Sequence, residues 1–368
     1  MELKRLITII TVALAVAASV LAPSARSAQA TTSLPFRSHS VSAPADAGAS
    51  STGSWNLFYQ AHVSGYYADV AVIRKTDAWA VADILHGSAT VFVPFVRHWN
   101  GRSWNAVTIS GASGFESDWV AASSATNVWV MGLAASGQTR AYRFDGSRWH
   151  AIPVPALTIL TDPVVFGSND VWALGNSGLS SSDIFHWNGI RWVGYSVGVN
   201  LQELSGTWSK DLWAVGLTSY ASNARLAAYY WNGSRWRTVS MPHPASTDGG
   251  ISVSSISDIW VGGLSVNSVY VLHWNGRTWR KVAATSSLPA NDHNLVPDGI
   301  GGLWLGPDVH WTGKVLQGPI RFSPQSAAQG EGPMARVTGI SSYWEVAGTI
   351  NFGASQEEPT IYLYGPVP

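Results

Sequence analysis

Six oxygen-bearing side chains recur at a near-constant interval ahead of a tryptophan. The interval is ten to twelve residues, and each Trp stands inside a short apolar run. The set comprises Asp69, Asp118, Asp162, Glu203, Asp248 and Asn294. If these side chains converge, their oxygens suit Ca²⁺ or a cationic ligand, with Asp69, Asp118, Asp162 and Glu203 as the candidate metal ligands. Closely spaced carboxylates also raise one another's pKa, as general acid–base catalysis requires.

A simpler explanation competes with this ring of acids. Asp and Asn often begin a strand after a loop, with the side chain in water. A polar connector that contains Asp292 and His293 is a second candidate binding segment, on the same side as the acids. Only a fold that brings equivalent positions of successive repeats together would unite these residues.

The elements that must position them are short strands. Seven apolar runs are each centred on a Trp, last four to six residues and are bounded by Ser, Asp or Gly, which is typical of buried strands and too short for helices. The central residues are Trp79, Trp129, Trp172, Trp213, Trp260, Trp304 and Trp344.

A hairpin signal follows five of these runs. It consists of an aromatic residue, Asn-Gly or Asp-Gly, two further residues and a Trp. Asn-Gly between two extended segments strongly predicts a hairpin, because both residues tolerate positive φ. The closing residues are Trp104, Trp149, Trp192, Trp236 and Trp279, at intervals of 45, 43, 44 and 43 residues.

Four short antiparallel strands repeated about every 43 residues predict an all-β fold, the β-propeller, and seven central Trp residues predict seven blades. The seventh copy ends before its fourth strand. Residues 53–57 (GSWNL) resemble residues 101–105 (GRSWN), so we expect the N-terminal strand to close the ring and to remove the exposed sheet edges.

This layout resembles the kelch repeat, in which a strand such as residues 213–216 (WAVG) precedes an aromatic residue, a turn, a Trp and a Pro, here Trp231, Trp236 and Pro242. At the repeat position after a central Trp, the double glycine of that family occurs once, at residues 262–263. The Gly-x-x-Trp hairpin also resembles the Asp-box of sialidase-type propellers, although the Asp position holds Trp99, Trp187, Trp231 and Trp274. The kelch resemblance implies a galactose-oxidase-like fold. The copper site of that enzyme needs a cysteine, and this chain has none.

Eighteen of the twenty Trp residues stand in register with the repeat, so we predict that they pack between blades. The two exceptions, Trp119 and Trp208, fall in first strands and are candidates for stacking on a ligand. The histidines that precede the turn-side Trp belong to different blades and cannot converge on one metal. They are His98, His186, His273 and His310.

The chain begins with a predicted secretory signal peptide over residues 1–30, with cleavage near Ala30. Residues 31–53, rich in Ser, Ala and Pro, indicate a flexible linker, and residues 54–368 a single propeller. Charged residues make up 12% of the chain, 22 basic and 22 acidic, which disfavours nucleic acid as a partner. No second apolar run of membrane-spanning length follows.

These features predict a secreted, monomeric, non-enzymatic binding or scaffold module for a carbohydrate or protein at the cell surface. The alternative is a carbohydrate-active enzyme, a glycosidase or lyase that uses the channel-mouth carboxylates. No cofactor is predicted apart from the candidate Ca²⁺.

Overall fold

The computed structural model describes residues 54–84, 93–156, 158–176, 182–198, 200–221, 223–242, 246, 248–265, 268–285, 295–323, 328–329, 334–337, 342–350 and 357–365. The predicted signal peptide, the linker and Asp292, His293 and Asn294 lie outside these residues. Within the described ranges, no helix is long and apolar enough to cross a membrane.

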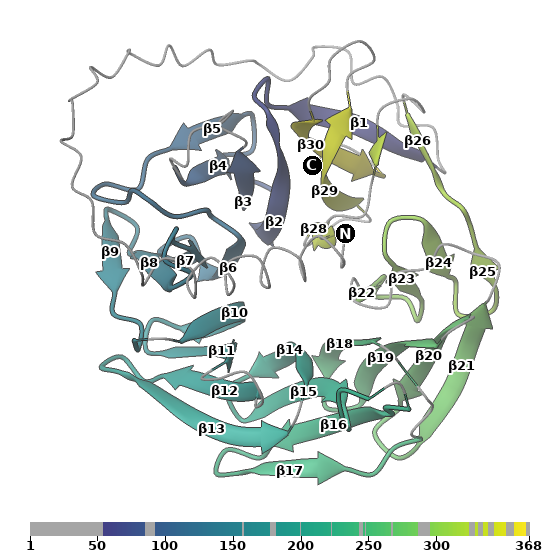
Figure 1. The fold of residues 1–368 in the computed structure, drawn as a ribbon. Coiled ribbons are helices and arrows are strands. Elements are labelled where there is room, and N and C mark those ends of the chain that lie inside the picture. The colour runs from purple at the N-terminus through teal and green to yellow at the C-terminus, as the bar shows by residue number, and fades with distance from the viewer. Residues whose placement is uncertain are drawn as a thin grey trace.

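Seven sheets, each with four antiparallel strands as its main part, stand around a ring, which confirms the predicted seven-bladed propeller (Figure 1). Blade 1 contains β2 (Gly65–Arg74), β3 (Asp77–Ile84), β4 (Phe95–Trp99) and β5 (Trp104–Val107). Blade 2 contains β6 (Trp119–Ser124), β7 (Asn127–Leu133), β8 (Thr139–Phe144) and β9 (Trp149–Ile152). Blade 3 contains β10 (Ile159–Gly167), β11 (Asp170–Asn176), β12 (Ser182–Trp187) and β13 (Trp192–Gly198).

Blade 4 contains β14 (Leu201–Trp208), β15 (Asp211–Leu217), β16 (Leu226–Trp231) and β17 (Trp236–Val239). Blade 5 contains β18 (Asp248–Ser255), β19 (Asp258–Ser265), β20 (Ser268–Trp274) and β21 (Trp279–Thr285). Blade 6 is the shortest, with β22 (Leu295–Pro297), β23 (Leu303–Leu305), β24 (Val309–Trp311) and β25 (Leu316–Gln317).

Blade 7 joins the two ends of the described chain. It contains β28 (Met334–Val337), β29 (Ser342–Ile350), β30 (Glu357–Tyr364) and, as its fourth strand, the N-terminal β1 (Ser54–Gln60). The antiparallel pairing of β1 with β30 agrees with the predicted ring closure (Figure 1). Two short strands add to this sheet beyond the sequence prediction. They are β26 (Arg321–Ser323), parallel to β1, and β27 (Ala328–Gln329), paired with β29.

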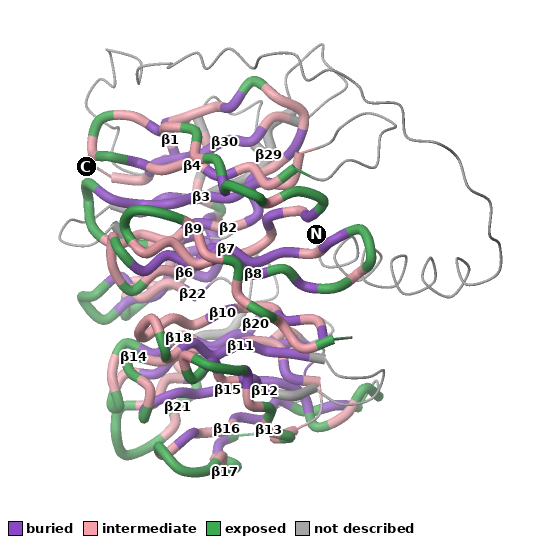
Figure 2. Tube along the Cα trace, turned by 90° about the vertical axis from the view of Figure 1, so that its left-hand side faces the viewer, coloured by how far each residue is buried: buried purple, intermediate pink, exposed green. Residues whose placement is uncertain are grey.

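The hydrophobic core consists of seven clusters, each formed by the facing surfaces of two neighbouring blades. The buried stretches run along the strands, and many exposed ones lie in the connections (Figure 2). All seven central Trp residues belong to these clusters and are buried. Trp129, for example, is fully buried against Leu160 and Trp187 of the next blade. The predicted packing role of the repeated Trp residues is therefore visible in the core.

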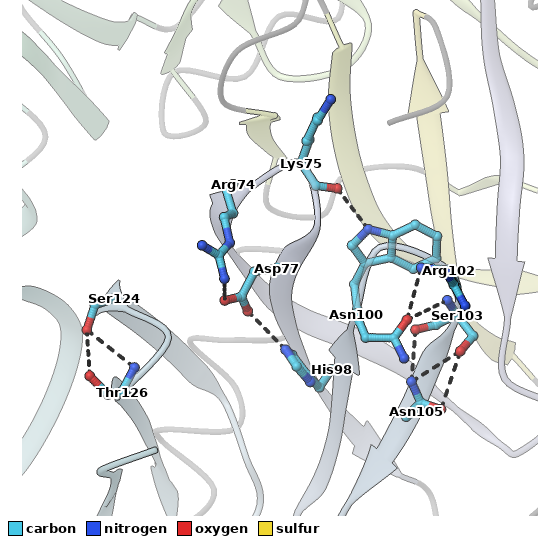
Figure 3. A network of polar contacts seen from close by, with 11 residues as sticks. Arg74, Lys75, Asp77, His98, Asn100, Arg102, Ser103, Asn105, Ser124 and Thr126 are labelled. Carbon is cyan, nitrogen blue, oxygen red and sulfur yellow. Dashed lines mark hydrogen bonds and ion pairs between the residues drawn. The ribbon is translucent and has the colours of Figure 1, made fainter.

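The Asn-Gly hairpins owe their shape to a side chain and a glycine (Figure 3). In blade 1, Asn100 Oδ1 accepts hydrogen bonds from the N–H groups of Arg102 and Ser103 at 2.9 and 3.0 Å. Gly101 has a φ of +88°, and a Cβ there would come within 2.9 Å of Thr76. The hairpin therefore lies against the turn between the first two strands. These hairpins and turns form one face of the ring, the hairpin face, and the connections at the other strand ends form the loop face.

Candidate functional site

The predicted ring of acids holds neighbouring blades together in three places. Asp69 Oδ2 accepts a hydrogen bond from the Val120 N–H at 2.9 Å, which joins blade 1 to blade 2. The other two bonds run from Leu204 N–H to Asp162 Oδ2, at 2.6 Å, and from Ile251 N–H to Glu203 Oε2, at 2.9 Å. In each case the residue that follows the donor pairs with the central Trp of its blade. The three donors therefore occupy the same position in their blades. We call these three hydrogen bonds the inter-blade clasps.

The two remaining carboxylates of the predicted ring make different contacts. Asp118 Oδ2 accepts a hydrogen bond from Leu133 N–H at 3.0 Å, within its own blade. Asp248 is 5% exposed and its Oδ1 accepts from Gly249 N–H at 3.0 Å. In the part of the chain that the structure describes, no three His, Asp or Glu side chains form a group that could hold a metal ion. The candidate Ca²⁺ therefore has no ligand set among these residues.

The junction of blades 2 and 3 replaces the clasp with packing. Trp119 pairs with Met131, two residues beyond the central Trp, which is the register position of Asp69 and Glu203 in their blades. The expected donor in blade 3 would be Pro163, which precedes the residue paired with Trp172 and carries no N–H. Trp119 packs instead into the cluster between the two blades. Its position is accounted for by this contact.

Trp208 lies at the end of its strand opposite to the end at which Trp119 lies in blade 2. It pairs with Asp211 beside the turn that follows β14, and 52% of its surface is exposed. The two non-repeating Trp residues are thus separated along the channel and do not form one stacking site. Trp208 contributes to the hairpin face, where Lys210 Nζ lies 5.9 Å from its ring centroid.

The four predicted hairpin-side histidines form a repeated structural unit. Each stacks on the central Trp of its blade, with ring centroids 4.0 to 4.5 Å apart. The Nε2 of each histidine also forms a hydrogen bond with a carboxylate oxygen, at 2.8 to 3.1 Å. The pairs are His98 with Asp77, His186 with Asp170, His273 with Asp258 and His310 with Asp298. These contacts stabilise separate blades and bring no two histidines together.

An acidic group on the loop face lies where blades 1 and 2 meet, and sequence analysis did not identify it. Tyr66 donates a hydrogen bond to Asp83 Oδ2 at 2.9 Å. Burial and the charges of Asp83 and Asp118 raise the pKa of Glu116 from 4.5 to about 8. Burial and Asp83 also raise the pKa of Tyr66 above its ordinary value. Glu116 is therefore protonated at neutral pH, beside two further acids.

A cavity of about 370 Å³ lies on the hairpin side of the channel, between the inner strands of blades 5 and 6. Its lining includes Ser252, Asp258 and Trp260 from blade 5, Val296 and Pro297 from blade 6, and Arg336 from blade 7. Arg336 reaches across to Gly299, whose φ is +78° and where a Cβ would come within 2.1 Å of the guanidinium. The glycine therefore leaves room for the cation at the cavity wall.

Sequence analysis missed Arg336, Asp83 and Glu116 because none of them repeats between blades. The one sequence feature that distinguishes these residues is that they stand at strand ends and do not recur in other blades. Many ordinary surface residues share that feature.

Comparison with known proteins shows the fold and no family. No protein-family profile matches this sequence, and no curated protein matches it. The kelch assignment thus lacks support, whereas the seven-bladed propeller stands. Among solved structures, YCF48 bound to D1 peptide is 14% identical with a TM-score of 0.55, over 86% of this chain and 96% of that chain.

Two further structures are similar. YCF48 from Cyanidioschyzon merolae is 12% identical with a TM-score of 0.53, over 84% of this chain and 98% of that one. SapL1 lectin in complex with alpha methyl fucoside is 15% identical with a TM-score of 0.48, over 72% of this chain and 98% of that one. The similarity to the lectin has a TM-score below 0.5, and the YCF48 structures, at 14% and 12% identity, share the fold alone.

Proposed function

We propose that this chain is a secreted, non-enzymatic binding module whose ligand is a sugar or a similarly polyhydroxylated group held in the cavity between blades 5 and 6. The main support for this proposal is the set of residues that line the cavity. Asp258 and the hydroxyls of Ser252 and Ser254 can accept hydrogen bonds, and Arg336 donates them. Val296 and Pro297 supply the apolar surface that a sugar ring needs.

The size of the cavity supports a small ligand. A volume of about 370 Å³ falls at the low end of the range for small-molecule sites, roughly 300–1,000 Å³. The cavity is lined by inner strands and their turn, which belong to packed sheets. A site on such elements is largely formed before the ligand arrives.

A glycan array and titration calorimetry of the propeller, residues 54–368, test this proposal. We expect Arg336→Ala to weaken binding at least tenfold, because the cation lines the cavity directly. Gly299→Ala should have a similar effect by displacing the guanidinium. Arg277→Ala, in the hairpin of blade 5 and away from the cavity, is the matched control. Equal affinity for wild type and Arg336→Ala, or no glycan binding at all, would exclude the cavity as a sugar site.

The second candidate function is a glycosidase or lyase, and the raised pKa of Glu116 favours it. A protonated Glu116 beside Asp83 and Asp118 has the charge pattern of a general acid with a neighbouring carboxylate. The clasps leave the other predicted acids bonded to backbone N–H groups. If the chain is an enzyme, Glu116→Gln should abolish turnover of a polysaccharide substrate while Glu203→Gln retains it.

Secretion and a monomeric state complete the proposal. Secretion is proposed from the charge and apolar pattern of residues 1–30. The monomeric state is proposed from the closure of the ring within one chain, which needs no strand from a second copy. N-terminal sequencing of protein from a culture medium should give a mature chain that begins near Thr31. Light scattering of that protein should give the mass of one chain.

A further inference from the structure

The hairpin face carries an unusual surface that the sugar-binding proposal does not use. Each of the six described hairpins that link a third and a fourth strand has one exposed cation at its tip. These tip cations are Arg102, Arg148, Arg191, Arg235, Arg277 and Lys314. The turns between first and second strands add exposed Lys75 and Lys210. The chain as a whole is neutral, so its charges are unevenly distributed.

Few acids oppose these cations at the tips. Among the six hairpins only Asp145 is acidic. It accepts backbone hydrogen bonds within the turn, pairs with His150 at 2.6 Å and lies 3.9 Å from Nε of the tip cation Arg148. Of the acids that begin second strands, Asp77, Asp170 and Asp258 pair with histidines. Asp77 also pairs with Arg74, and Asp211 accepts hydrogen bonds from Thr207 and Trp213. The loop face, by contrast, carries the acids around Glu116. The hairpin face is therefore the cationic side of the ring.

The same face exposes large apolar side chains. Of the seven exposed large hydrophobic residues in the described part of the chain, five lie here, on blades 3 to 6. These tip apolar residues are Ile190, Trp208, Ile256, Ile300 and Val315. Ile300 is 91% exposed and Ile190 81%. Trp208, Ile256 and Ile300 occupy or border the inner turns of three consecutive blades, on the side of the channel where blades 4 to 6 lie.

The fold does not require these side chains. The hairpin position of Ile190 holds Arg102, Ser147, Ser234 and Arg277 in other blades. The turn position of Ile256 holds Lys75, Ala125, Ser168 and Ser209. Since polar or small residues serve the same turns elsewhere in the ring, an exposed isoleucine here has no local structural purpose. Exposed apolar groups surrounded by charges typically mark an interaction surface.

We infer that the hairpin face docks on an anionic lipid bilayer. The tip cations meet the lipid phosphates, and the tip apolar residues enter the boundary between headgroups and acyl chains. A soluble polyanion would match the cations equally well, but it would gain nothing from Ile190, Ile256 and Ile300. The combination of both residue classes on one face favours the bilayer. The inference is independent of the sugar cavity.

Vesicle co-sedimentation of the propeller tests this inference. We expect binding to vesicles of phosphatidylglycerol and phosphatidylcholine, little binding to phosphatidylcholine alone, and weaker binding as salt rises. The double variant Ile256→Ser/Ile300→Ser should lose at least tenfold in vesicle affinity. The triple variant Arg191→Gln/Arg235→Gln/Arg277→Gln should lose at least as much.

The loop face offers the matched control. Arg140→Gln/Tyr220→Ser changes one exposed cation and one exposed aromatic on the other side of the ring and should bind vesicles as wild type does. Thermal unfolding should be unchanged in every variant, because the altered side chains are exposed. Absence of sedimentation with anionic vesicles at low salt would overturn the inference. The inference would also be overturned if the isoleucine variant bound vesicles as wild type does and soluble polyphosphate captured the protein equally well. That result would identify an anionic polymer as the partner.

Discussion

Glu116 differs from the other acids of the channel mouth in what surrounds it. Asp69, Asp162 and Glu203 each accept a backbone hydrogen bond from the next blade. Glu116 is half-buried and faces Asp83 and Asp118, and its pKa rises to about 8. A carboxyl group in such surroundings costs stability whenever it is forced to ionise.

The sign of the resulting pH dependence follows from linkage. Below about pH 4.5 Glu116 is protonated in both the folded and the unfolded chain and has no effect. Between about pH 4.5 and 8 the folded state keeps a proton that the unfolded state loses, so the free energy of unfolding falls as pH rises. Because the side chain is partly exposed, solvent screens part of the effect, and we expect about 1 kcal/mol in total.

Glu116→Gln removes this titration. Urea unfolding at pH 5 and pH 9 should show that the variant is stabilised relative to wild type at pH 9 and nearly equal to it at pH 5. An identical pH dependence of the two proteins would contradict the raised pKa.

At the scale of strands, the clasps show how neighbouring blades are joined without disulfides. The inner strand of a blade has one edge without a strand partner in its own sheet. In blades 2, 4 and 5 a carboxylate from the previous blade accepts a hydrogen bond from one N–H there. Where the next strand carries Pro163 and has no N–H to offer, the acid is replaced by Trp119 and the junction is closed by packing. The hydrogen-bonded clasp and the packed Trp119 therefore both join the inner strands of two neighbouring blades.

Glu203→Ala should therefore destabilise the junction of blades 4 and 5. The Ile251 N–H loses its carboxylate acceptor, and we expect the free energy of unfolding to fall by about 1–2 kcal/mol. Glu203→Gln keeps an acceptor oxygen and should lose less than half of that amount. Urea denaturation measures both, and an alanine variant as stable as wild type would show that the clasp contributes nothing.

At the scale of the whole molecule, the ring depends on its closure by β1. Trp55 is fully buried between blades 6 and 7, and its Nε1 donates a hydrogen bond to Pro307 O at 2.7 Å. The strand also pairs with β30 through Asn56 and Leu363. One N-terminal strand thus joins the first and last parts of the propeller.

Trp55→Ala should lower the free energy of unfolding by about 3–5 kcal/mol, because it leaves a large cavity and an unpaired carbonyl. Trp208→Ala is the control, since that side chain is 52% exposed, and should change stability by less than about 0.5 kcal/mol. Calorimetric melting compares the two variants. Equal effects would mean that β1 does not fasten the ring.

The fold was predictable from the sequence because its determinants are local. An Asn-Gly pair bends the chain within four residues, and an apolar run around a Trp forms a strand wherever it recurs. Seven copies of the Trp-centred run and five of the hairpin signal imply the ring, and the match of residues 53–57 to a fourth strand implies its closure. The additional strands β26 and β27 of blade 7 were not predictable, because they are two or three residues long and carry no repeat signal.

The role of the acids was decided by the tertiary structure. Their spacing indicated one rim of the channel, but Asp69 meets the backbone of Val120, 51 residues away, and the sequence contains no measure of how one blade is rotated against the next. That rotation determines whether a carboxylate meets another carboxylate, as around Glu116, or a backbone N–H. The sequence by itself determined the repeat, the strands and the hairpins through short-range geometry. The tertiary structure decided which side chains face one another, because those contacts cross between blades.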